Sequence, residues 1–595
     1  MLPHKQIESA LQGAVRAVLP DADVSTVLVR PCDPKFGDYQ SNALMSLARA
    51  HKLNPRQLAM EVASKLDLSA ICEKVEIAGA GFLNFRLKHD LLAATLAAAA
   101  RGEHLFFEPA ARPLTKVIDF SSPNVAKPMH VGHIRSTGIG DALQRVLRLL
   151  GHRVISDNHI GDWGTQFGKL LLGWKQILDR AALERDAIAE LERLYKIINT
   201  ECDANPARLE EAKVELVKLQ AGDAENISIW KEMIRLSQVQ FDAIYSRLGV
   251  KFDYVLGESF YNPRLGDVVA DLLARGIACE SEGAIGVFSD GSLPAKEDPF
   301  LVSRDGEWVP DPALVRKSDG GFNYTTTDLA TVDYRLKSWS PHEIIYVVDD
   351  RQSGHFKKLF RIVGRWKPDE AKSVKLVHAG FGKILGEDGR PFKTRSGDTV
   401  KLGDLLDEAQ GRAFELVKSK QMEREESDRV PETFWPEIAR IVGVGSVKYA
   451  DLLPNRQSDY IFSWDKMLAF NGNTAPYLQY AYARIKSIFR KADASNIQHS
   501  TPKFQLGAAE ELALARHLLN FGLTLEAVAD ELRPNYLCNY LYELAGKFTS
   551  FYENCPVLSA DDAATRNSRL LLCDLTARVL KEGLAVLGIE VVEQM

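Results

Sequence analysis

The chain has 595 residues, of which 46% are apolar and 26% are charged, the balance of a folded globular protein rather than a disordered or fibrous one. This length exceeds what one hydrophobic core supports, so about three or four domains are expected. A net charge of −6 argues against a simple basic nucleic-acid binder, although basic residues could still gather on one face.

The sequence gives no sign of a membrane-bound or secreted protein. No apolar run approaches the roughly 18 residues of a membrane span, and the first residues lack the apolar core of a signal peptide. The seven cysteines have no paired spacing, which predicts reduced thiols. We therefore expect a cytoplasmic protein that does not bind membranes.

The first 110 residues have the pattern of a small α/β module. Helices are predicted over 5–19, 54–66 and the alanine-rich 91–100, and strands over 75–77 and 82–85. Prolines at 109 and 113 then mark a linker to the next domain.

The most informative stretch is SSPNVAKPMHVGH at 121–133, between a predicted strand at 116–120 and a predicted helix. Free N–H groups at such a turn, together with the helix dipole, favour a phosphate. Gly132 leaves room for a flat purine against the backbone, and His130 and His133 can stabilise charge that develops on phosphate oxygens. The stretch therefore predicts a nucleotide-binding turn.

The two histidines alone have other interpretations. They could form a metal pair, or begin a helix as satisfied polar residues. A zinc site needs at least two further ligands, and the sequence has no Cys-x-x-Cys and no second histidine pair to supply them.

The rest of the chain continues the same architecture. Further strands are predicted at 153–156, 343–348 and 374–378, with a charged helical stretch at about 170–250 and a helix at 354–365. These elements predict a nucleotide-binding fold that is split by an insertion. After about residue 435 the pattern is almost entirely helical, which predicts a helical bundle.

The stretch at 121–133 resembles the HIGH motif of class I aminoacyl-tRNA synthetases, in the form found in bacterial arginyl-tRNA synthetases. Other segments that resemble this family lie at 79–86, 157–164, 322–333, 346–355, 379–406, 443–453 and 471–488. The resemblance implies three domains with these bounds: a small α/β domain at 1–110 that binds the tRNA elbow, a Rossmann-type α/β catalytic domain at 111–435 with a connective helical insertion at about 170–340, and an all-α anticodon-binding bundle at 436–595.

The resemblance also implies the reaction, which is ATP-dependent attachment of L-arginine to tRNA(Arg). The arginine carboxylate attacks the α-phosphate of ATP to give arginyl-adenylate and pyrophosphate. The arginyl group then passes to the 2′-hydroxyl of the terminal adenosine, and AMP is released. Such chemistry needs positioning and charge neutralisation rather than a nucleophilic side chain. We expect Mg²⁺ to arrive with ATP, no tightly bound metal, and a monomer.

A site that selects arginine against lysine needs carboxylates placed to accept from the planar guanidinium. The family's guanidinium-binding positions match Asp119 and Asp328, and its pocket adds Tyr324 and Gln352, with Asn124 at the α-amino end. Without the resemblance, Asp328 could be a helix N-terminal acid and Tyr324 a core residue.

Two loops at predicted strand ends supply further candidates, because loops at the carboxyl ends of parallel strands form the ligand crevice. His159 is expected beside the substrate. Asp350 and His355 are expected to line the adenosine pocket.

Class I enzymes carry a second mobile loop, Lys-Met-Ser-Lys, whose lysine stabilises the leaving pyrophosphate. The matching segment here is GRPFKTRSG at 389–397, in which Thr394 replaces the second lysine. We hypothesise that Lys127 supplies the missing cation, assisted by Lys393 or Arg395. The last two residues could equally be solvated charges on a loop.

Aromatic and basic side chains alternate at helical spacing over 473–486. Tyrosine stacking combined with phosphate contacts is how unpaired nucleotides are held, but these tyrosines could also be core residues. The family reads the anticodon with this helix and the chain end. The tRNA-contact candidates are Phe82 and Asn84 at the elbow, and Tyr477, Tyr480, Tyr482, Arg484 and Met595 at the anticodon.

Three rival functions can be distinguished by the residues present. A small-molecule nucleotidyltransferase with the same His-x-Gly-His turn would not need a large helical bundle. A non-catalytic tRNA-binding relative would not need the histidine pair, Lys127 and both acids. A cysteine or glutamine synthetase would not need two acids that face the amino-acid side chain.

Overall fold

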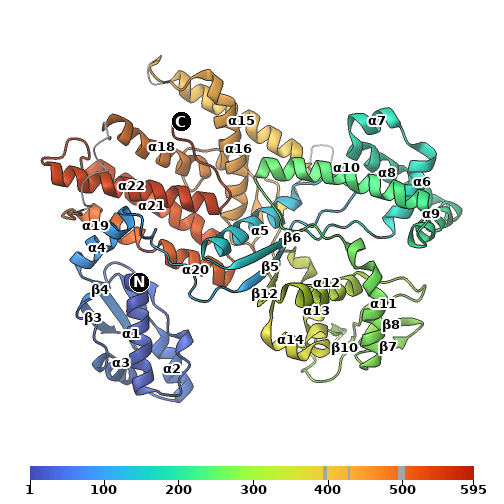
Figure 1. The fold of residues 1–595 in the computed structure, drawn as a ribbon, viewed down its shortest axis with the longest axis horizontal. Helices are drawn as coiled ribbons and strands as arrows, with labels where there is room; N and C mark the ends of the chain where they lie inside the picture. Colours follow the sequence, from blue (N-terminus) through green and yellow to red (C-terminus); the bar gives the residue numbers. More distant parts are fainter. Residues whose placement is uncertain (393–398, 427–428, 493–502) are drawn as a thin grey trace. The chain divides into compact units, whose positions relative to one another are not determined.

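The computed structural model describes residues 1–392, 399–426, 429–492 and 503–595 (Figure 1). These residues form two compact units. One consists of 111–416 and 442–467, and the other of 1–110, 417–441 and 468–595. The N-terminal module and the C-terminal helices, which we expected as two separate domains, therefore belong to one compact unit.

A four-stranded parallel sheet forms the centre of the unit that begins at residue 111. Its order is β13 (Lys375–His378), β12 (Glu343–Tyr346), β5 (Thr115–Asp119) and β6 (Arg153–Asp157). The register aligns the last residues of three neighbouring strands, Tyr346, Asp119 and Asp157. The predicted Rossmann-type α/β arrangement is confirmed, and its strand ends bring two carboxylates side by side.

Helices pack on this sheet and supply its core. They are α5 (Gly132–Leu149), α11 (Glu258–Ala274), α12 (Tyr324–Trp339) and α13 (Ser353–Trp366). Val117 and Ile344 of the sheet pack with Leu329 of α12 and Leu359 of α13, all completely buried. Gly140 of α5 is also required, because a Cβ there would overlap the Phe120 ring.

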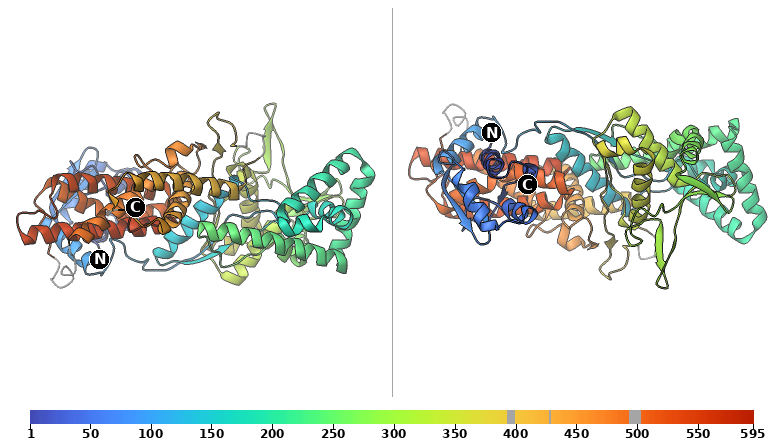
Figure 2. Two further views of the ribbon diagram at one scale, coloured as in Figure 1. Left: turned by 90° about the horizontal axis from the view of Figure 1, so that it is seen from above. Right: turned by 90° about the horizontal axis from the view of Figure 1, so that it is seen from below.

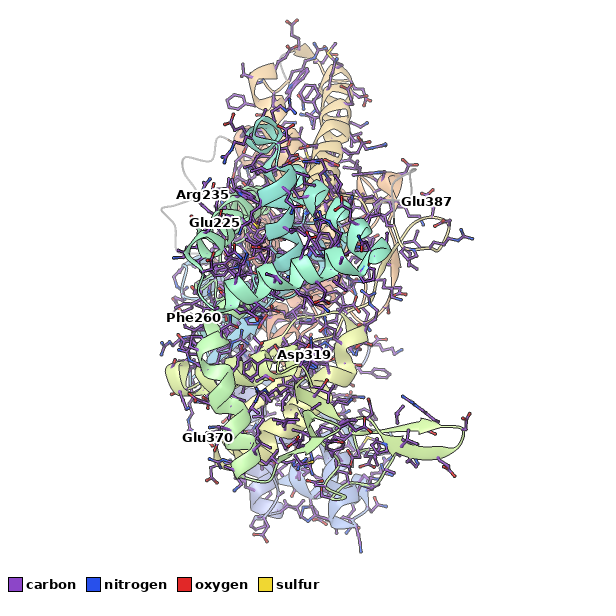
Figure 3. The ribbon with its side chains drawn as sticks, turned by 90° about the vertical axis from the view of Figure 1, so that its right-hand side faces the viewer. Glu225, Arg235, Phe260, Asp319, Glu370 and Glu387 are labelled. Atoms are coloured by element: carbon purple, nitrogen blue, oxygen red, sulfur yellow. The ribbon has the colours of Figure 1, made fainter. Side chains whose placement is uncertain are left out.

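The insertion begins as a helical bundle, drawn in teal to green in Figures 1 and 2. It contains α6 (Gln166–Ile177), α7 (Arg180–Arg185), α8 (Ala187–Ala204), α9 (Pro206–Gln220) and α10 (Ala224–Leu248). Glu225 and Arg235 of α10 illustrate its charged outer surface (Figure 3), and Arg235 pairs with Glu232 at 2.7 Å. The charged stretch is therefore a solvated helix face, as the sequence indicated.

The second half of the insertion differs from the expected helices. It forms short antiparallel strands, namely β7 (Ala278–Ser281), β8 (Ala284–Val287), β9 (Leu301–Arg304), β10 (Glu307–Pro310) and β11 (Ala313–Arg316). Tight turns with Gly283 and Gly306 at positive φ, 77° and 87°, join two of these pairs and exclude a continuous helix.

The remaining elements of this unit are short strands and helices. They are α14 (Pro368–Ser373), β14 (Ile384–Leu385), β15 (Tyr460–Ile461) and α17 (Trp464–Met467), together with parts of α15 (Leu402–Met422) and α16 (Trp435–Leu452). Strands β14 and β15 pair in parallel, Ile384 with Tyr460.

The other unit joins an antiparallel sheet to helices from both ends of the chain. The sheet order is β1 (Arg30–Pro31), β2 (Tyr39–Ser41), β4 (Phe82–Leu87) and β3 (Cys72–Ala78). Its N-terminal helices are α1 (Pro3–Val18), α2 (Ala43–His51), α3 (Pro55–Ser64) and α4 (His89–Ala100). Its C-terminal helices are α18 (Ala475–Lys491), α19 (Ala509–Leu518), α20 (Phe521–Glu531), α21 (Asn535–Asn554) and α22 (Ala563–Val586). Arg578 of α22 donates to the Ala99 carbonyl of α4 at 2.9 Å.

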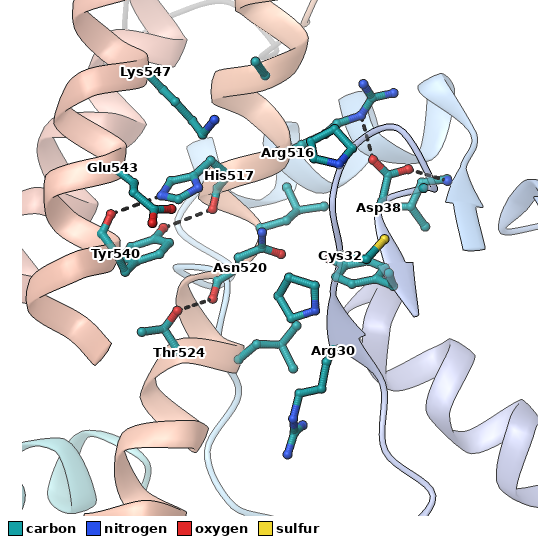
Figure 4. Close-up of a pocket in the computed structure, with 18 of the residues that line it drawn as sticks. Arg30, Cys32, Asp38, Arg516, His517, Asn520, Thr524, Tyr540, Glu543 and Lys547 are labelled. Atoms are coloured by element: carbon teal, nitrogen blue, oxygen red, sulfur yellow. Dashed lines mark hydrogen bonds and ion pairs between the residues drawn. The ribbon is translucent and has the colours of Figure 1, made fainter. Parts of the chain in front are cut away.

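A cavity of about 630 Å³ lies in this second unit, lined by residues around β1 and β2 and by α19 to α21 (Figure 4). Its polar groups are largely paired with one another: Arg516 lies 2.7 Å from Asp38, and the His517 ring stacks on Tyr540. None of the described residues predicted to bind substrate lines this cavity. Among the described residues, no helix has both the length and the apolar character that a membrane crossing requires.

Candidate active site

The turn between β5 and α5 has an unusual backbone. Ser121, Ser122 and Ala126 adopt positive φ angles of 73°, 49° and 62°, which are unfavourable for residues other than glycine. Side chains of other elements hold it there, because the Ser122 N–H donates to Asn158 Oδ1 and the Ala126 N–H donates to Ser237 Oγ, each at 2.9 Å. Strain of this kind, about 1–3 kcal/mol per residue, is typical of functional sites.

The two histidines of the turn are oriented by backbone N–H groups. Gly132 N–H donates to His130 Nδ1 at 3.1 Å, and His130 N–H donates to His133 Nδ1 at 3.0 Å. Because Nδ1 of His130 accepts, the proton of its neutral ring belongs on Nε2, whereas Nδ1 of His133 also lies 3.2 Å from the His130 carbonyl, so either of its ring nitrogens can carry the proton. Burial lowers the pKa of His130 and lowers that of His133 to about 3. The pair can therefore present two neutral N–H donors to a ligand.

Gly132 has a second role that the sequence did not indicate. A Cβ at this position would come within 2.9 Å of the His130 ring. The glycine therefore allows the histidine to fold over the helix start.

Segments before and after the predicted loop at 389–397 hydrogen-bond to the histidine turn and to the helix that follows it. Val131 N–H donates to the Val400 carbonyl at 2.9 Å, in an antiparallel bridge between His130 and Lys401. On the other side, the buried Arg135 of α5 donates to the carbonyls of Gly382 and Ser458, at 3.3 and 3.1 Å. Lys393 and Arg395 themselves lie outside the described residues.

Asp119 and Asp157 share one buried partner. Arg335 of α12, with 0% of its side chain exposed, donates from Nη2 to Asp119 Oδ2 at 2.6 Å and to Asp157 Oδ2 at 2.8 Å. Asp119 Oδ1 accepts from Ser122 Oγ at 3.2 Å. Asp119 is therefore already hydrogen-bonded through Oδ2 to an arginine of the chain itself, which its place in the sequence did not indicate.

Asp328 is also paired within the chain. Its Oδ2 lies 2.6 Å from His355 Nε2, and the ring of Tyr324, which is 61% exposed, meets the His355 ring edge-on at 4.8 Å. His355, which we expected to line the adenosine pocket, thus contacts Asp328, which we expected in the arginine pocket. Gln352 and Asp350 are exposed at the end of the adjoining loop.

Glu258, at the start of α11, belongs to the same group of charges. Burial raises its pKa to about 7; the neighbouring His159 lowers it, whereas Asp328 and Asp162 raise it further. Sequence analysis missed this residue because an acid in the first turn of a helix is ordinary. Only the tertiary structure shows that it is enclosed with other acids.

Asn124 and His159 are fixed by the loop after β6. Asn124 forms a parallel bridge with Gly161, where any Cβ would overlap the Asn124 amide. His159 Nδ1 lies 3.0 Å from the Leu256 carbonyl. The structure therefore brings together most of the predicted small-molecule site at the carboxyl ends of the parallel strands.

Comparison with known proteins agrees with this arrangement. Three family models match the chain: tRNA synthetases class I (R), catalytic domain, at 102–464; DALR anticodon binding domain, at 478–595; and arginyl tRNA synthetase N terminal domain, at 4–87. Proteins called arginine--tRNA ligase from Nostoc sp. and Salmonella agona are both 46% identical to the chain. The alignments cover 100% of this chain and 99% of the Nostoc protein, and 99% of both in the second case.

The chain belongs to the arginyl-tRNA synthetase family. The crystal structure of arginyl-tRNA synthetase from Plasmodium falciparum is similar over 100% of this chain and 99% of that one, with 30% identity and a TM-score of 0.80. The arginyl-tRNA synthetase of Thermus thermophilus is 25% identical with the same TM-score, and the whole of both chains is covered. The fold class inferred from the sequence is thereby confirmed.

The tRNA-contact candidates differ in exposure. In α18, Tyr480 is 41% exposed and Tyr477 is half-buried with its ring 5.6 Å from that of Tyr542, which is 37% exposed. Arg484 lies over the Tyr552 ring at 4.6 Å. Tyr542, which sequence analysis did not single out, thus forms an aromatic pair with Tyr477.

Tyr482 requires a correction, because only 2% of it is exposed and its hydroxyl donates to Glu593 at 2.7 Å. Its ring supports the chain end instead of offering a face to a base. Met595 and Asn84 are also buried, with 7% and 5% exposed, whereas Phe82 is half-buried. In this chain, the contacts of Tyr482 and Arg490 with Glu593 make the chain end a support for α18.

Proposed function

We propose that the residues gathered at the ends of β5, β6 and β12 carry out ATP-dependent attachment of L-arginine to tRNA(Arg) through arginyl-adenylate. Arginine attachment to tRNA is the activity of the family to which the chain belongs. The proposal assigns this activity to particular side chains.

The ATP part of the site uses the histidine turn. His130 and His133 donate from Nε2 to phosphate oxygens, and for His130 the Gly132 N–H contact to Nδ1 supports this direction. As neutral donors they stabilise the charge that develops on the α-phosphate. Lys127, exposed at the end of the strained turn, neutralises the leaving pyrophosphate. Gly132, Asp350 and His355 complete the nucleotide contacts, and Lys393 or Arg395 assists Lys127.

The arginine part of the site uses acidic groups. Asp119 and Asp328 accept from the guanidinium, with Tyr324, Gln352 and His159 around it, and Asn124 holds the α-amino end. Glu258 joins this group because it lies among Asp328, Asp162 and His159. The pocket is therefore complementary to a cation with several donors.

Outside the chemical centre, Tyr477, Tyr480 and Arg484 contact the anticodon, and Phe82 contacts the tRNA elbow. Met595 and Asn84 act by supporting these surfaces. Mg²⁺ neutralises phosphate charge as part of the ATP complex, and we assign it no ligand from this chain. We expect a monomer in the cytoplasm, where its tRNA substrate is used.

The excess of acids over cations at the strand ends carries the proposal. Asp119 and Asp157 share one buried arginine, Arg335, and Asp328 lies close enough to Glu258 to raise the pKa of Glu258. Pyrophosphate exchange with each amino acid, with and without tRNA, tests it. Exchange specific to arginine is expected. Exchange with a different amino acid and none with arginine would contradict the assignment.

The raised pKa of Glu258 predicts a pH dependence of arginine binding. The guanidinium of arginine binds the ionised form of Glu258. Protein molecules in which Glu258 is protonated must therefore lose that proton before arginine binds. With a pKa of about 7, the KM for arginine at pH 6 should be about tenfold higher than its value well above pH 7. Glu258→Gln should raise the KM and remove this dependence, whereas Glu307→Gln, at an exposed acid of β10, should leave it unchanged.

The same shift predicts the stability of the arginine-free protein. The pKa of Glu258 in the folded protein lies above its ordinary value of 4.5. The contribution of this group to the free energy of unfolding is therefore complete at low pH and is lost as pH rises through about 7. Relative to Glu258→Gln, the wild-type melting temperature should therefore fall as pH rises from about 4.5 to about 7, and level off above that. Equal pH profiles for the two proteins would contradict the placement of Glu258.

A further inference from the structure

We infer that Arg335 is a positioning residue for arginine recognition, which fixes the carboxylate of Asp119 and sets the net charge that the substrate guanidinium meets. The inference rests on the proposed function, because it concerns the acid that we assign to the substrate side chain. It concerns a residue 216 positions away from Asp119 in the sequence.

The geometry leaves Asp119 little freedom. Asp119 and Asp157 are paired in the register of β5 and β6, and one nitrogen of Arg335, Nη2, contacts both at 2.6 and 2.8 Å. The last residue of β12, Tyr346, places its ring 5.5 Å from the same guanidinium. Three strand ends thus converge on one side chain. Oδ2 of Asp119 is turned inward, which leaves Oδ1, beside Ser122, for a bound guanidinium.

The charges explain why two carboxylates share one arginine. Asp119 is only 5% exposed, and burial disfavours a charged carboxylate that has no cation nearby. Arg335 supplies that cation. If Arg335 were paired with Asp119 alone, its positive charge would cancel the negative charge that attracts the substrate. The carboxylate of Asp157 balances Arg335 instead. The three groups together retain one negative charge, which a substrate guanidinium neutralises.

Stability alone does not require this arrangement, since buried ion networks are often replaced by apolar side chains without loss of stability. Removing one member is different, because it leaves buried charges uncompensated. Arg335→Met would leave Asp119 and Asp157 adjacent, and the variant could simply fail to fold. The informative variant is therefore Arg335→Met with Asp157→Asn. It keeps the single negative charge of the cluster and removes the contact that holds Asp119 in place.

The experiment measures pyrophosphate exchange in the presence of tRNA, with the melting temperature of each protein as a check on folding. In the double variant the KM for arginine is expected to rise about 10- to 100-fold, while kcat and the KM for ATP stay within about twofold. Discrimination against lysine should weaken in parallel, because the Asp119 carboxylate is no longer held in the orientation that suits the planar guanidinium.

A matched control lies in the same sheet, on β5 and β12. Lys116 of β5 pairs with Glu343 of β12 at 2.7 Å, and both are buried at the other end of the sheet. Lys116→Met with Glu343→Gln removes a buried pair of the same kind, and the KM for arginine should not change.

Two outcomes would overturn the inference. One is a folded Arg335→Met/Asp157→Asn protein whose KM for arginine lies within twofold of wild type. The other is an equal rise in the control variant, which would mean that any loss of a buried pair has this effect. Failure of the proposed function has a separate signature, namely a wild-type protein that shows no exchange with arginine.

Discussion

Replacing Lys127 with alanine should slow arginyl-adenylate formation by about 10²- to 10³-fold, the loss seen when a single charge-stabilising donor is removed from a reaction centre. Lys127 follows Ala126, whose left-handed backbone is held by Ser237 of α10. Its Nζ lies 5.2 Å from the centre of the Tyr195 ring. An exposed cation that rests on an aromatic ring can leave it at small cost, because such contacts are worth about 0.5–1 kcal/mol at exposed sites.

The loss should appear in kcat for pyrophosphate exchange, because the leaving group gains its charge only in the transition state. Affinity for tRNA should stay within about twofold of wild type. Tyr195→Phe is the matched control, since it keeps the aromatic ring and should leave exchange unchanged. Near-normal exchange by Lys127→Ala would remove Lys127 from the mechanism and leave Lys393 or Arg395 as the cation.

The nucleotide-binding turn could be predicted because its signals are local. The apolar strand that ends at Asp119, Gly132 and the amphipathic helix that follows all lie within a short segment. The positive φ angles of Ser121 and Ser122 could not be predicted. Serine has no preference for that conformation, and the groups that hold it come from distant parts of the chain.

Charge pairing was the main gap in the sequence-based description of the site. Asp119 and Asp328 were predicted to bind the substrate guanidinium, and the sequence did not indicate the partner that each has within the chain, Arg335 and His355. An arginine within an otherwise ordinary helix carries no mark of burial. Its partners become apparent only when the register aligns Asp119 with Asp157.

Exposure was the second gap. Tyr477, Tyr480 and Tyr482 lie within six residues of one helix, and the sequence pattern treated them alike. A helix turns about 100° per residue, so side chains two or five positions apart point in different directions. Tyr480 faces outward, whereas Tyr482 packs against the chain end through Glu593.

Neutralising both Asp119 and Asp328 should abolish specific arginine binding, with a KM for arginine about 10²- to 10⁴-fold higher. Each carboxylate that hydrogen-bonds a charged donor is worth about 1.5–3 kcal/mol, or roughly 10- to 100-fold, and the two contacts involve the same guanidinium. Asp119→Asn leaves Arg335 compensated by Asp157, and Asp328→Asn leaves an amide beside His355, so neither change strands a buried charge.

The measurement combines the KM for arginine in pyrophosphate exchange with the rise in melting temperature that arginine causes. Asp333→Asn is the matched control: it lies on the same helix as Asp328, pairs with Lys337 and Lys367 at 2.7 and 2.9 Å, and should leave the KM unchanged. The two single variants should each lose less than the double variant, because one acid can still orient the guanidinium. If arginine stabilises the double variant as it does the wild type, the cationic side chain is recognised elsewhere, and the acids at the strand ends serve only to hold Arg335 and His355.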